Sequence, residues 1–343
     1  MSEQPLLKVE GLKKYFPVEK GFLRRVVGQV KAVDDVSLEI QAGETLGLVG
    51  ESGSGKTTVG RCILRALDPT AGSIQFQIDD ETTVDMANIS PRELRDVRRH
   101  ANMIFQDPFY SLDPRWTILD IVGEPLKLAK LAQGKELEKR VAHLMDVVGL
   151  EAKHLRRYPH AFSGGQRQRI GVARALATNP RLIIADEPVS ALDVSTQAQI
   201  LNLLNDLQSE FGLSYLFIAH DLSVVEHISD RVAVMYVGKL VEVAPKDQLF
   251  FFPKHPYTEA LLSASPTPNP DVVKNRIILP GEIANPADPP AGCYFHPRCR
   301  YAQARCQEEE PRLREISPDQ WVSCHFAEEL ELIGAPRPGS QNL

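Results

Sequence analysis

A glycine-rich segment near the N-terminus constrains the fold of this chain more than any other feature. Residues 50–57 read GESGSGKT and follow the apolar run TLGLV at residues 45–49. This is the pattern of a phosphate-binding loop, or P-loop, in which glycines let consecutive backbone N–H groups point at phosphate oxygens. The helix that follows directs the positive end of its dipole at the same point. The sequence therefore predicts a strand, a P-loop and a helix, with nucleotide phosphates bound at the loop.

The polar residues of this loop have distinct expected roles. Lys56 should contact the β- and γ-phosphates, and the Thr57 hydroxyl should bind Mg²⁺. Ser54 and Thr58 should add phosphate contacts. The pattern alone does not separate kinases, GTPases and ATPases, and a glycine-rich turn that only resembles a P-loop is the alternative. The predicted nucleotide contacts in this segment are Gly50, Ser52, Gly53, Ser54, Gly55, Lys56, Thr57 and Thr58.

Residues 6 to 246 alternate β-branched runs with helical patterns, which is typical of α/β folds. Beyond this region, frequent prolines interrupt any long helix or central strand. We therefore expect an α/β nucleotide-binding domain at residues 6–260 and a loop-rich extension at residues 261–330. Residues 331–343 contain two prolines and two glycines, which predicts a disordered tail.

A helical subdomain is expected within the first of these domains, at about residues 90–165. A helix should begin at Ser90, because this N-cap serine is followed by Pro91 at the first helical position and by Glu93 three residues after the cap. Residues 134–148 predict a second long helix. The region is therefore interpreted as an insertion in the α/β domain.

Two further apolar runs end in polar residues that suit phosphate chemistry. Residues 181–185 read RLIIA and precede Asp186 and Glu187, and residues 215–219 read YLFIA and precede His220. In parallel sheets, ligands gather at the carboxyl ends of the strands, so these side chains should lie beside the P-loop. We expect Asp186 to bind Mg²⁺, Glu187 to polarise the water that attacks the γ-phosphate, and His220 to sense that phosphate. Solvent-exposed acids and a structural histidine are the alternatives.

The segment SGGQ at residues 163–166 precedes another strong helical pattern at residues 170–177. A serine N-cap and two glycines that permit a close backbone approach make a second anion-binding helix terminus. One nucleotide needs only one such terminus. The second is explained if two subunits face each other and each SGGQ segment completes the ATP site of the partner. The predicted contacts with the partner's ATP are Ser163, Gly164, Gly165 and Gln166.

Together, the P-loop, the acidic pair and the SGGQ segment resemble the motifs of ABC ATPases, over residues 6 to 250. The resemblance implies a P-loop NTPase fold and an enzyme that hydrolyses ATP with Mg²⁺. It also implies that Gln106 is the lid glutamine, which couples nucleotide to a membrane partner, and that Asp193 belongs to the D-loop. The implied catalytic residues are Lys56, Glu187 and His220, and the implied Mg²⁺ ligands are Thr57, Gln106 and Asp186.

The same resemblance implies an aromatic side chain that stacks on adenine. The segment KKYFP at residues 13–17 offers Tyr15 and Phe16. We expect Phe16 to stack on the base, because the aromatic residue of this family usually comes two residues after the lysine that Lys14 matches. Tyr15 is the alternative.

A narrower resemblance is to the ATPase subunits of oligopeptide and dipeptide importers, and most of all to the F-type ATPase of dipeptide permeases. It implies ATP-driven import of di- or oligopeptides, with nickel chelates and other small solutes as alternative cargoes. The implied partners are a homologous D-type ATPase subunit, two integral membrane permeases and, indirectly, an extracytoplasmic solute-binding protein; a homodimer stays open. The segments that carry this resemblance are residues 13–18, 157–163, 189–195, 220–227 and 255–262.

Four of the five cysteines fall in the last sixth of the chain. In a reducing compartment this clustering favours a metal site over disulfides. Four thiolates suit tetrahedral zinc or a four-iron, four-sulfur (4Fe-4S) cluster, and the spacing matches neither zinc ribbons nor ferredoxins. Free structural thiols are a further alternative, and the resemblance to peptide-importer ATPases implies the 4Fe-4S cluster. The expected ligands are Cys293, Cys299, Cys306 and Cys324, with His296 and His325 adjacent in a zinc version.

The composition excludes several other classes of protein. The net charge of −6 argues against a dedicated nucleic-acid binder. No run approaches the roughly 20 apolar residues that span a bilayer, and residues 1–10 lack the pattern of a secretory signal. We therefore expect a peripheral protein on the cytoplasmic face of the membrane.

Residues 107–115, DPFYSLDPR, with the helices after them, are the expected docking surface for the permease, and an ordinary surface loop of the helical subdomain is the alternative. An ABC ATPase without a transporter, acting in DNA repair or on ribosomes, is the rival from another class. A redox sensor regulated by its cysteines is a second rival. The rival without a transporter usually has a second ATPase unit, a long coiled coil or inserted zinc modules, and the sequence indicates none of these.

Overall fold

The computed structural model describes residues 4–21, 25–265 and 276–335. The chain folds into two compact units, which we name after the motifs that they carry. The carboxylate unit contains Met1–Lys8, Glu39–Thr45 and Ile74–Ile218, and the P-loop unit contains Val9–Leu38, Leu46–Ser73 and Ala219–Leu343. Because the chain passes repeatedly between the units, this division differs from the domains at 6–260 and 261–330, which stay a prediction.

Parallel strands form the sheet of the carboxylate unit. β6 (Ala101–Ile104) pairs with β7 (Leu182–Asp186), and β7 pairs with β8 (Ser214–Ala219), both in parallel. Every residue of β7 and β8 is buried, as expected for a parallel sheet that is covered on both faces. A separate antiparallel pair joins β4 (Ala71–Gln77) and β5 (Thr83–Asp85). The apolar runs predicted before the acidic pair and before the histidine are therefore strands.

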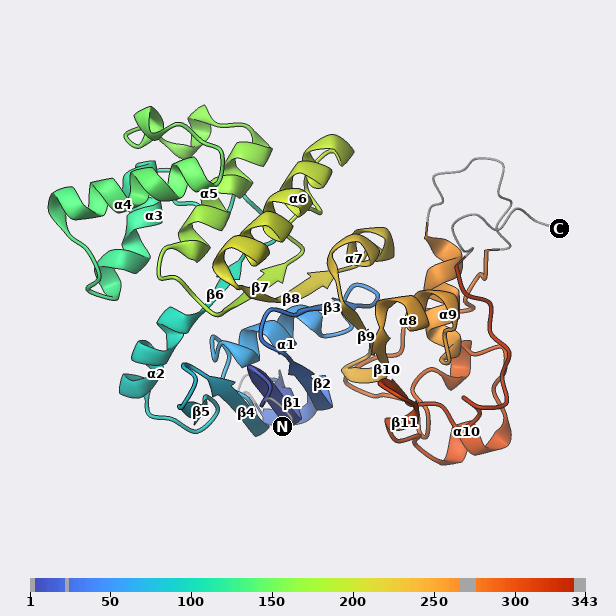
Figure 1. Ribbon diagram of the computed structural model, residues 1–343. Helices are drawn as coiled ribbons and strands as arrows, with labels where there is room; N and C mark the ends of the chain where they lie inside the picture. Colours follow the sequence, from blue (N-terminus) through green and yellow to red (C-terminus); the bar gives the residue numbers. More distant parts are fainter. Residues whose placement is uncertain (1–3, 22–24, 266–275, 336–343) are drawn as a thin grey trace. The chain divides into compact units, whose positions relative to one another are not determined.

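Helices make up the rest of the carboxylate unit. They are α2 (Pro91–Val97), α3 (Ile118–Leu128), α4 (Gly134–Val147), α5 (Gly164–Leu176) and α6 (Val194–Phe211), with 3-10 helices at Arg98–His100, Ala152–His154 and Pro159–Ala161. The predicted helix start is confirmed, because Ser90 Oγ accepts a hydrogen bond from the Glu93 N–H at 3.3 Å and Glu93 Oε2 accepts one from the Ser90 N–H at 2.9 Å. The helix expected at residues 134–148 is α4. Figure 1 shows α3, α4 and α5 packed as one cluster, and β6 also falls within residues 90–165.

The P-loop unit is built on a mixed sheet. β3 (Thr45–Val49) pairs in parallel with β9 (Arg231–Tyr236), and β9 pairs antiparallel with β10 (Lys239–Pro245). The C-terminal part of the chain extends this sheet, because β12 (Gln320–Val322) pairs with β10, and β11 (Arg314–Ser317) pairs with β12. The extension that we expected to be loop-rich is therefore tied to the sheet by two strands.

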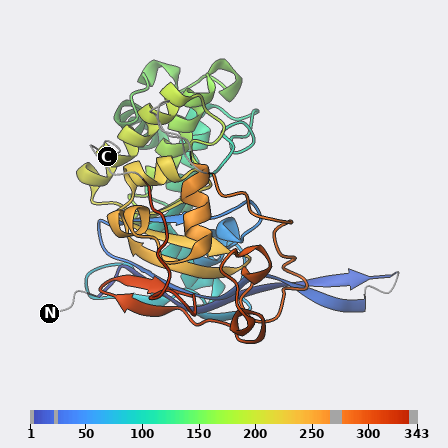
Figure 2. The same ribbon diagram turned by 90° about the vertical axis from the view of Figure 1, so that its right-hand side faces the viewer.

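Two long strands and several short helices complete the P-loop unit. β1 (Leu7–Lys20) and β2 (Arg25–Ile40) are neighbours, and Figure 2 shows their ends running together as a two-stranded ribbon. The helices are α1 (Lys56–Ile63), α7 (Leu222–Ile228), α8 (Lys246–Phe251), α9 (Pro256–Ala264) and α10 (Ala304–Glu308), with a 3-10 helix at His296–Arg298. Tyr236, Tyr257 and Phe295 are each at most 2% exposed, and their rings pack against one another. Within the described ranges, no helix is long and apolar enough to cross a membrane.

The tail predicted to be disordered at residues 331–343 is described only at its start, and residues 336–343 lie outside the described residues. The Ile333 N–H donates to Glu259 Oε1 at 3.0 Å, and the Ala335 N–H donates to the Phe250 carbonyl oxygen at 2.7 Å. Hydrogen bonds therefore hold the described start of the tail.

Candidate functional site

The P-loop follows β3, whose five residues are all buried. Its glycines have positive φ angles, which are 153° at Gly50, 79° at Gly53 and 107° at Gly55. A Cβ atom at Gly50 would lie 2.1 Å from the carbonyl oxygen of Met235, and one at Gly55 would lie 2.1 Å from that of Ala32. Gly50 and Gly55 are therefore required both for the backbone conformation and for space.

Helix α1 begins directly after this loop without a side-chain cap; its N-cap residue is Gly55. Because the N–H groups of a first turn lack acceptors inside the helix, this kind of start favours an anion as their acceptor. The ammonium group of Lys56, which is 4% exposed, donates to the carbonyl oxygens of Gly50 at 2.7 Å and Glu51 at 2.9 Å, and to Ser54 Oγ at 3.3 Å. The structure therefore places the predicted phosphate-binding lysine inside the loop.

The acidic pair follows β7 in the carboxylate unit. Asp186 is the buried last residue of β7 and is 2% exposed. Glu187 has a φ of 47°, a conformation that is uncommon outside glycine, and its N–H donates to the Ile218 carbonyl oxygen at 2.9 Å. The Gln106 side-chain amide donates to Glu187 Oε2 at 3.0 Å. The structure therefore brings together the predicted lid glutamine and the predicted catalytic glutamate.

The SGGQ segment opens α5 with a capping box. Ser163 Oγ accepts a hydrogen bond from the Gln166 N–H at 3.3 Å, and the Ser163 N–H donates to Gln166 Oε1 at 3.0 Å. A Cβ atom at Gly165 would lie 2.4 Å from Thr196 Cγ2. The Thr196 N–H and hydroxyl donate to Asp193 at 2.9 and 2.8 Å. The predicted signature segment and the predicted D-loop aspartate therefore lie side by side.

His220 comes directly after β8, belongs to the P-loop unit and is exposed. The next residue, Asp221, is the N-cap of α7, and its Oδ1 accepts a hydrogen bond from the Ser223 N–H at 2.9 Å. His220 is therefore placed at the carboxyl end of its strand, as the sequence predicted.

The two candidate adenine-stacking residues lie on opposite faces of β1, because consecutive residues of a strand alternate. The Tyr15 hydroxyl donates to Asp34, and burial together with this hydrogen bond raises the pKa of Tyr15 above its ordinary value. On the other face, the Lys14 ammonium lies 5.1 Å from the centroid of the Phe16 ring. The assignment of Phe16 to adenine stacking stays a prediction.

The predicted motifs are divided between the two units. The P-loop, His220 and the two aromatic residues belong to the P-loop unit, whereas Gln106, the acidic pair, the SGGQ segment and Asp193 belong to the carboxylate unit. The sequence did not predict two residues that contact the P-loop. Arg298 and Tyr257 both form hydrogen bonds with Glu51, and they are separated from it by 247 and 206 residues.

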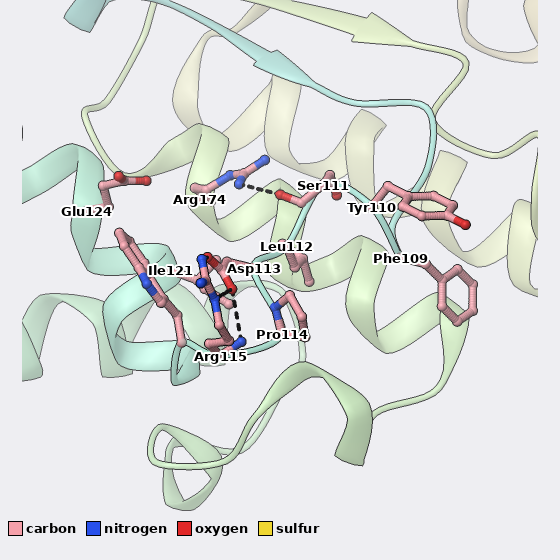
Figure 3. A pocket seen from close by; sticks show the side chains of 11 residues that line it. Phe109, Tyr110, Ser111, Leu112, Asp113, Pro114, Arg115, Ile121, Glu124 and Arg174 are labelled. Atoms are coloured by element: carbon pink, nitrogen blue, oxygen red, sulfur yellow. Dashed lines mark hydrogen bonds and ion pairs between the residues drawn. The ribbon is translucent and has the colours of Figure 1, made fainter.

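A cavity of about 770 Å³ lies over the segment that was predicted to dock the permease. Arg174 Nη1 donates to the Ser111 carbonyl oxygen at 2.8 Å, and Arg115 Nη2 lies 2.8 Å from Asp113 Oδ2 (Figure 3). Tyr110, which also lines the cavity, is 92% exposed. The predicted docking segment is therefore an open, partly aromatic surface.

The four late cysteines line one cavity of about 20 Å³, together with His296 and His325. Burial raises the pKa of the Cys293 thiol to about 12 and the pKa values of the Cys299 and Cys324 thiols to about 11. Across the part of the chain that the structure describes, no group of three or more His, Cys, Asp or Glu side chains is arranged to hold a metal ion. The thiols converge, and the metal centre stays a prediction. We call residues 293–324 the cysteine module.

The sequence of this chain is similar to known protein families and to individual transport proteins. Residues 33–190 match the ABC transporter family, and residues 241–306 match the C-terminal region of oligopeptide/dipeptide transporters. The chain is 51% identical to the oligopeptide transport ATP-binding protein AppF of Bacillus subtilis over 328 residues. The matched residues make up 95% of this chain and 98% of AppF. It is 50% identical to the probable peptide ABC transporter ATP-binding protein y4tS of Sinorhizobium fredii, over 93% of this chain and 89% of that protein.

A solved structure supports the fold. The dimeric structure of the ATP-binding cassette MJ0796 in a post-hydrolysis state, bound to ADP and Pi, matches with a TM-score of 0.60 and 30% identity, covering 70% of this chain and 98% of that one. The fold is therefore the ABC ATPase cassette, a P-loop NTPase fold. The chain belongs to the ATP-binding proteins of the ABC transporter family, in the group that carries the oligopeptide/dipeptide transporter C-terminal region.

Proposed function

We propose that this chain hydrolyses ATP to power the import of di- or oligopeptides, or of related small solutes, through an ABC transporter. The observation that carries the proposal is the match of residues 241–306 to the oligopeptide/dipeptide transporter C-terminal region. A relative named for oligopeptide transport, 51% identical over 95% of the chain, supports it. The same match disfavours an ABC ATPase that acts in DNA repair or on ribosomes. Nickel chelates remain an alternative cargo, because no residue of this chain needs to contact the cargo.

In this proposal the P-loop binds the phosphates of ATP. Lys56 exchanges its hydrogen bonds to the loop carbonyls for contacts with the β- and γ-phosphates. The phosphates are also bound by the backbone N–H groups of the loop and by Ser52, Ser54 and Thr58. His220 forms a hydrogen bond with the γ-phosphate and thereby distinguishes ATP from ADP. The buried environment of the lysine supports this role, since a charge-assisted contact is strongest where water is excluded.

For Mg²⁺ we propose the three oxygen donors that the sequence assigned to it. Thr57 supplies a hydroxyl, Gln106 an amide oxygen, and Asp186 a carboxylate that is 2% exposed, and hard cations prefer such ligands. When bound, Mg²⁺ neutralises negative charge on the phosphates. Glu187 accepts a proton from the attacking water, and the hydrogen bond from Gln106 orients its carboxylate.

We further propose that two ATPase subunits face each other. Ser163 and Gln166 are exposed at the start of α5, so the signature segment is accessible to the nucleotide of a partner. Asp193 lies beside this segment through Thr196 and would belong to the same contact surface. The related cassette MJ0796 is described as dimeric in its solved structure. A homologous D-type subunit is the proposed partner, with a homodimer as the alternative.

The proposed contact surface for the membrane permease is the open surface at residues 107–115. Its exposed aromatic side chains, Phe109 and Tyr110, and its cavity would receive a cytoplasmic segment of an integral permease. The chain would then act as a peripheral subunit on the cytoplasmic face. A solute-binding protein outside the membrane would be linked only indirectly, and no nucleic acid would take part.

For the cysteine module, we propose a metal centre held by four thiolates, with a 4Fe-4S cluster as the first choice and zinc as the alternative. The donor set supports it, because all four thiols line one cavity. This cavity has room for roughly one water-sized atom, so the ligand segments would have to move outward to hold a cluster. Anaerobic purification followed by metal analysis and an absorption spectrum tests it. Iron with sulfide-to-iron absorption supports the cluster, one zinc per chain supports the alternative, and a metal-free protein overturns both.

The main experiment is purification from native membranes, followed by reconstitution of the complex into vesicles. We expect two integral permeases and a second ATPase subunit to co-purify, and a peptide with its binding protein to stimulate ATP hydrolysis. Glu187→Gln should bind ATP normally and abolish the stimulated hydrolysis. Recovery with ribosomes or DNA, or ATP hydrolysis that never responds to any peptide or chelate, would contradict the proposal.

A further inference from the structure

Three side chains hold Glu51, the second residue of the P-loop, and two of them, Tyr257 and Arg298, lie outside the phosphate chemistry. Its N–H donates to the Tyr257 hydroxyl at 2.8 Å. Its carboxylate accepts two hydrogen bonds from Arg298, at 2.8 and 3.2 Å. Its carbonyl oxygen accepts a hydrogen bond from Lys56 at 2.9 Å. The residue that carries one acceptor of the predicted phosphate-binding lysine is therefore fixed by two residues from the C-terminal part of the chain.

The contact between Arg298 and Glu51 has the geometry of a strong ion pair. Both terminal nitrogens of the guanidinium group bind the two carboxylate oxygens, an arrangement that adds direction as well as energy. The Arg298 side chain is 10% exposed and that of Glu51 is 31% exposed. Because water screens this pair little, removal of one partner leaves the other poorly compensated. The pair can therefore fix the path of the P-loop backbone.

Arg298 is part of the cysteine module. It ends the 3-10 helix that lies between Cys293 and Cys299, and its N–H donates to the Phe295 carbonyl oxygen at 3.0 Å. The Phe295 ring packs against Tyr257, with a centroid distance of 5.3 Å, and also lines the cysteine cavity. The orientation of Arg298 therefore depends on how the cysteine module packs.

A second contact joins the same module to the strands that carry the candidate adenine-stacking residues. The Tyr294 hydroxyl donates to Asp34 Oδ2 at 3.3 Å, and Tyr15 donates to the other oxygen of this carboxylate. The Lys31 N–H donates to the Pro286 carbonyl oxygen at 2.9 Å, just before the module. The module and the segment before it therefore contact the P-loop and the neighbouring strands at separate points.

We propose that Arg298 is a positioning residue for the P-loop: through Glu51, the cysteine module holds the loop in the conformation that binds ATP. In this proposal Arg298 acts through Glu51 and not on the reacting phosphate itself. Its loss therefore raises the ATP concentration needed for half-saturation and leaves the rate at saturation nearly unchanged. This inference rests on the proposed role of the P-loop as the phosphate site of ATP.

The test measures ATP affinity and hydrolysis of the full chain in its transporter complex. Arg298→Ala should weaken ATP binding about tenfold and change kcat by less than about twofold. Arg298→Lys keeps the charge and loses the two-pronged contact, so it should fall between Arg298→Ala and the wild type. Glu51→Ala combined with Arg298→Ala should bind ATP no more weakly than the worse single variant, because both remove the same contact. Tyr257→Phe, a milder change, should weaken ATP binding about threefold.

Arg300→Ala is the matched control. Arg300 lies two residues away and pairs with the buried Glu259 at 2.8 Å instead of with Glu51. It should leave ATP affinity unchanged even where it lowers thermal stability, which is measured for every variant. Equal losses of ATP affinity in both arginine variants, or unchanged affinity in Arg298→Ala and Tyr257→Phe, would overturn the proposal. If Lys56→Ala in the same assay retains ATP binding, the assignment of the P-loop itself fails instead.

Discussion

Two glycine-rich turns each open a helix in this molecule, and they are built differently. The P-loop opens α1 with Gly55 at the N-cap and no side-chain cap. The SGGQ segment opens α5 with a reciprocal capping box of Ser163 and Gln166. The first helix start is therefore suited to an acceptor from outside the chain, whereas at the second the Ser163 side chain already accepts a hydrogen bond from the first turn. This difference fits a P-loop that binds the chain's own ATP and a signature segment that meets the ATP of a partner.

The two turns also differ in what supports them. The SGGQ segment packs against Thr196 on the next helix, only 31 residues from Gly165 in the sequence. The P-loop is supported by Arg298 and Tyr257, more than 200 residues away. Changes at the P-loop should therefore affect ATP binding, and changes at the SGGQ segment should affect hydrolysis in the assembled pair.

The largest effect is expected from Lys56→Ala. Loss of the ammonium group should weaken ATP binding more than about 100-fold and reduce hydrolysis to background, since a charge-assisted contact with phosphate is lost in a buried site. Ser163→Ala is the comparison variant and should keep ATP binding while it lowers hydrolysis. Equilibrium binding of a fluorescent ATP analogue and phosphate release measure both. Equal loss of binding in the two variants would end the distinction between the turns.

Gly55→Ala should have the next largest effect. Its new Cβ would meet the Ala32 carbonyl oxygen at 2.1 Å in a backbone with a φ of 107°, and we expect a loss of about 3 kcal/mol in stability together with weak ATP binding. Gly53→Ala is the matched control, because nothing lies within 4 Å of its Cβ and only its φ of 79° is unfavourable, at about 1 kcal/mol. Urea unfolding and ATP titration compare the two. A similar cost at both positions would mean that space is not what selects glycine at Gly55.

Gly165→Ala tests the signature segment in the same way. Its Cβ would lie 2.4 Å from Thr196 Cγ2, so α5 must shift from α6, and hydrolysis should fall about tenfold with ATP binding unchanged. Adding Thr196→Ser removes this methyl group and keeps the hydroxyl that donates to Asp193, so it should restore much of the rate. No rescue would show that the methyl contact does not control the position of the segment.

Local patterns account for most of what the sequence predicted. The P-loop glycines, the Ser90 helix start and the buried strand before Asp186 depend on residues within a few positions of one another, so propensity and spacing suffice. The pairing of β12 with β10 and the ion pair between Glu51 and Arg298 join distant segments. Such contacts depend on how the whole chain packs, and no short pattern records them. The convergence of the cysteines was expected from their clustering, whereas their packing against the same aromatic residues as the P-loop support was not.

The long-range support of the P-loop unit should also depend on pH, through an effect smaller than those above. Asp34, 6% exposed, accepts hydrogen bonds from Tyr15 and Tyr294 and pairs with Lys239 at 3.1 Å. Burial alone would raise the pKa of Asp34, but the Tyr15 hydrogen bond and the charge of Lys239 together lower it below its ordinary value of 3.8. Since the pKa is lowered in the folded state, the stabilisation is present above pH 4 and is lost as the pH falls through the folded pKa.

Asp34→Asn should therefore lower the free energy of unfolding by about 1 kcal/mol at pH 7, and the difference should shrink toward pH 3. Its neighbour Asp35 provides the control. The Asp35 side chain is 66% exposed, and its Oδ1 lies 3.9 Å from Lys13 Nζ, which is a weak, solvent-screened ion pair. Asp35→Asn should therefore change the free energy of unfolding by less than about 0.5 kcal/mol at either pH. Urea unfolding at both pH values measures the three proteins. A cost for Asp34→Asn that is the same at pH 3 and pH 7 would mean that packing, and not the charge of Asp34, joins the cysteine module to the strands beside the P-loop.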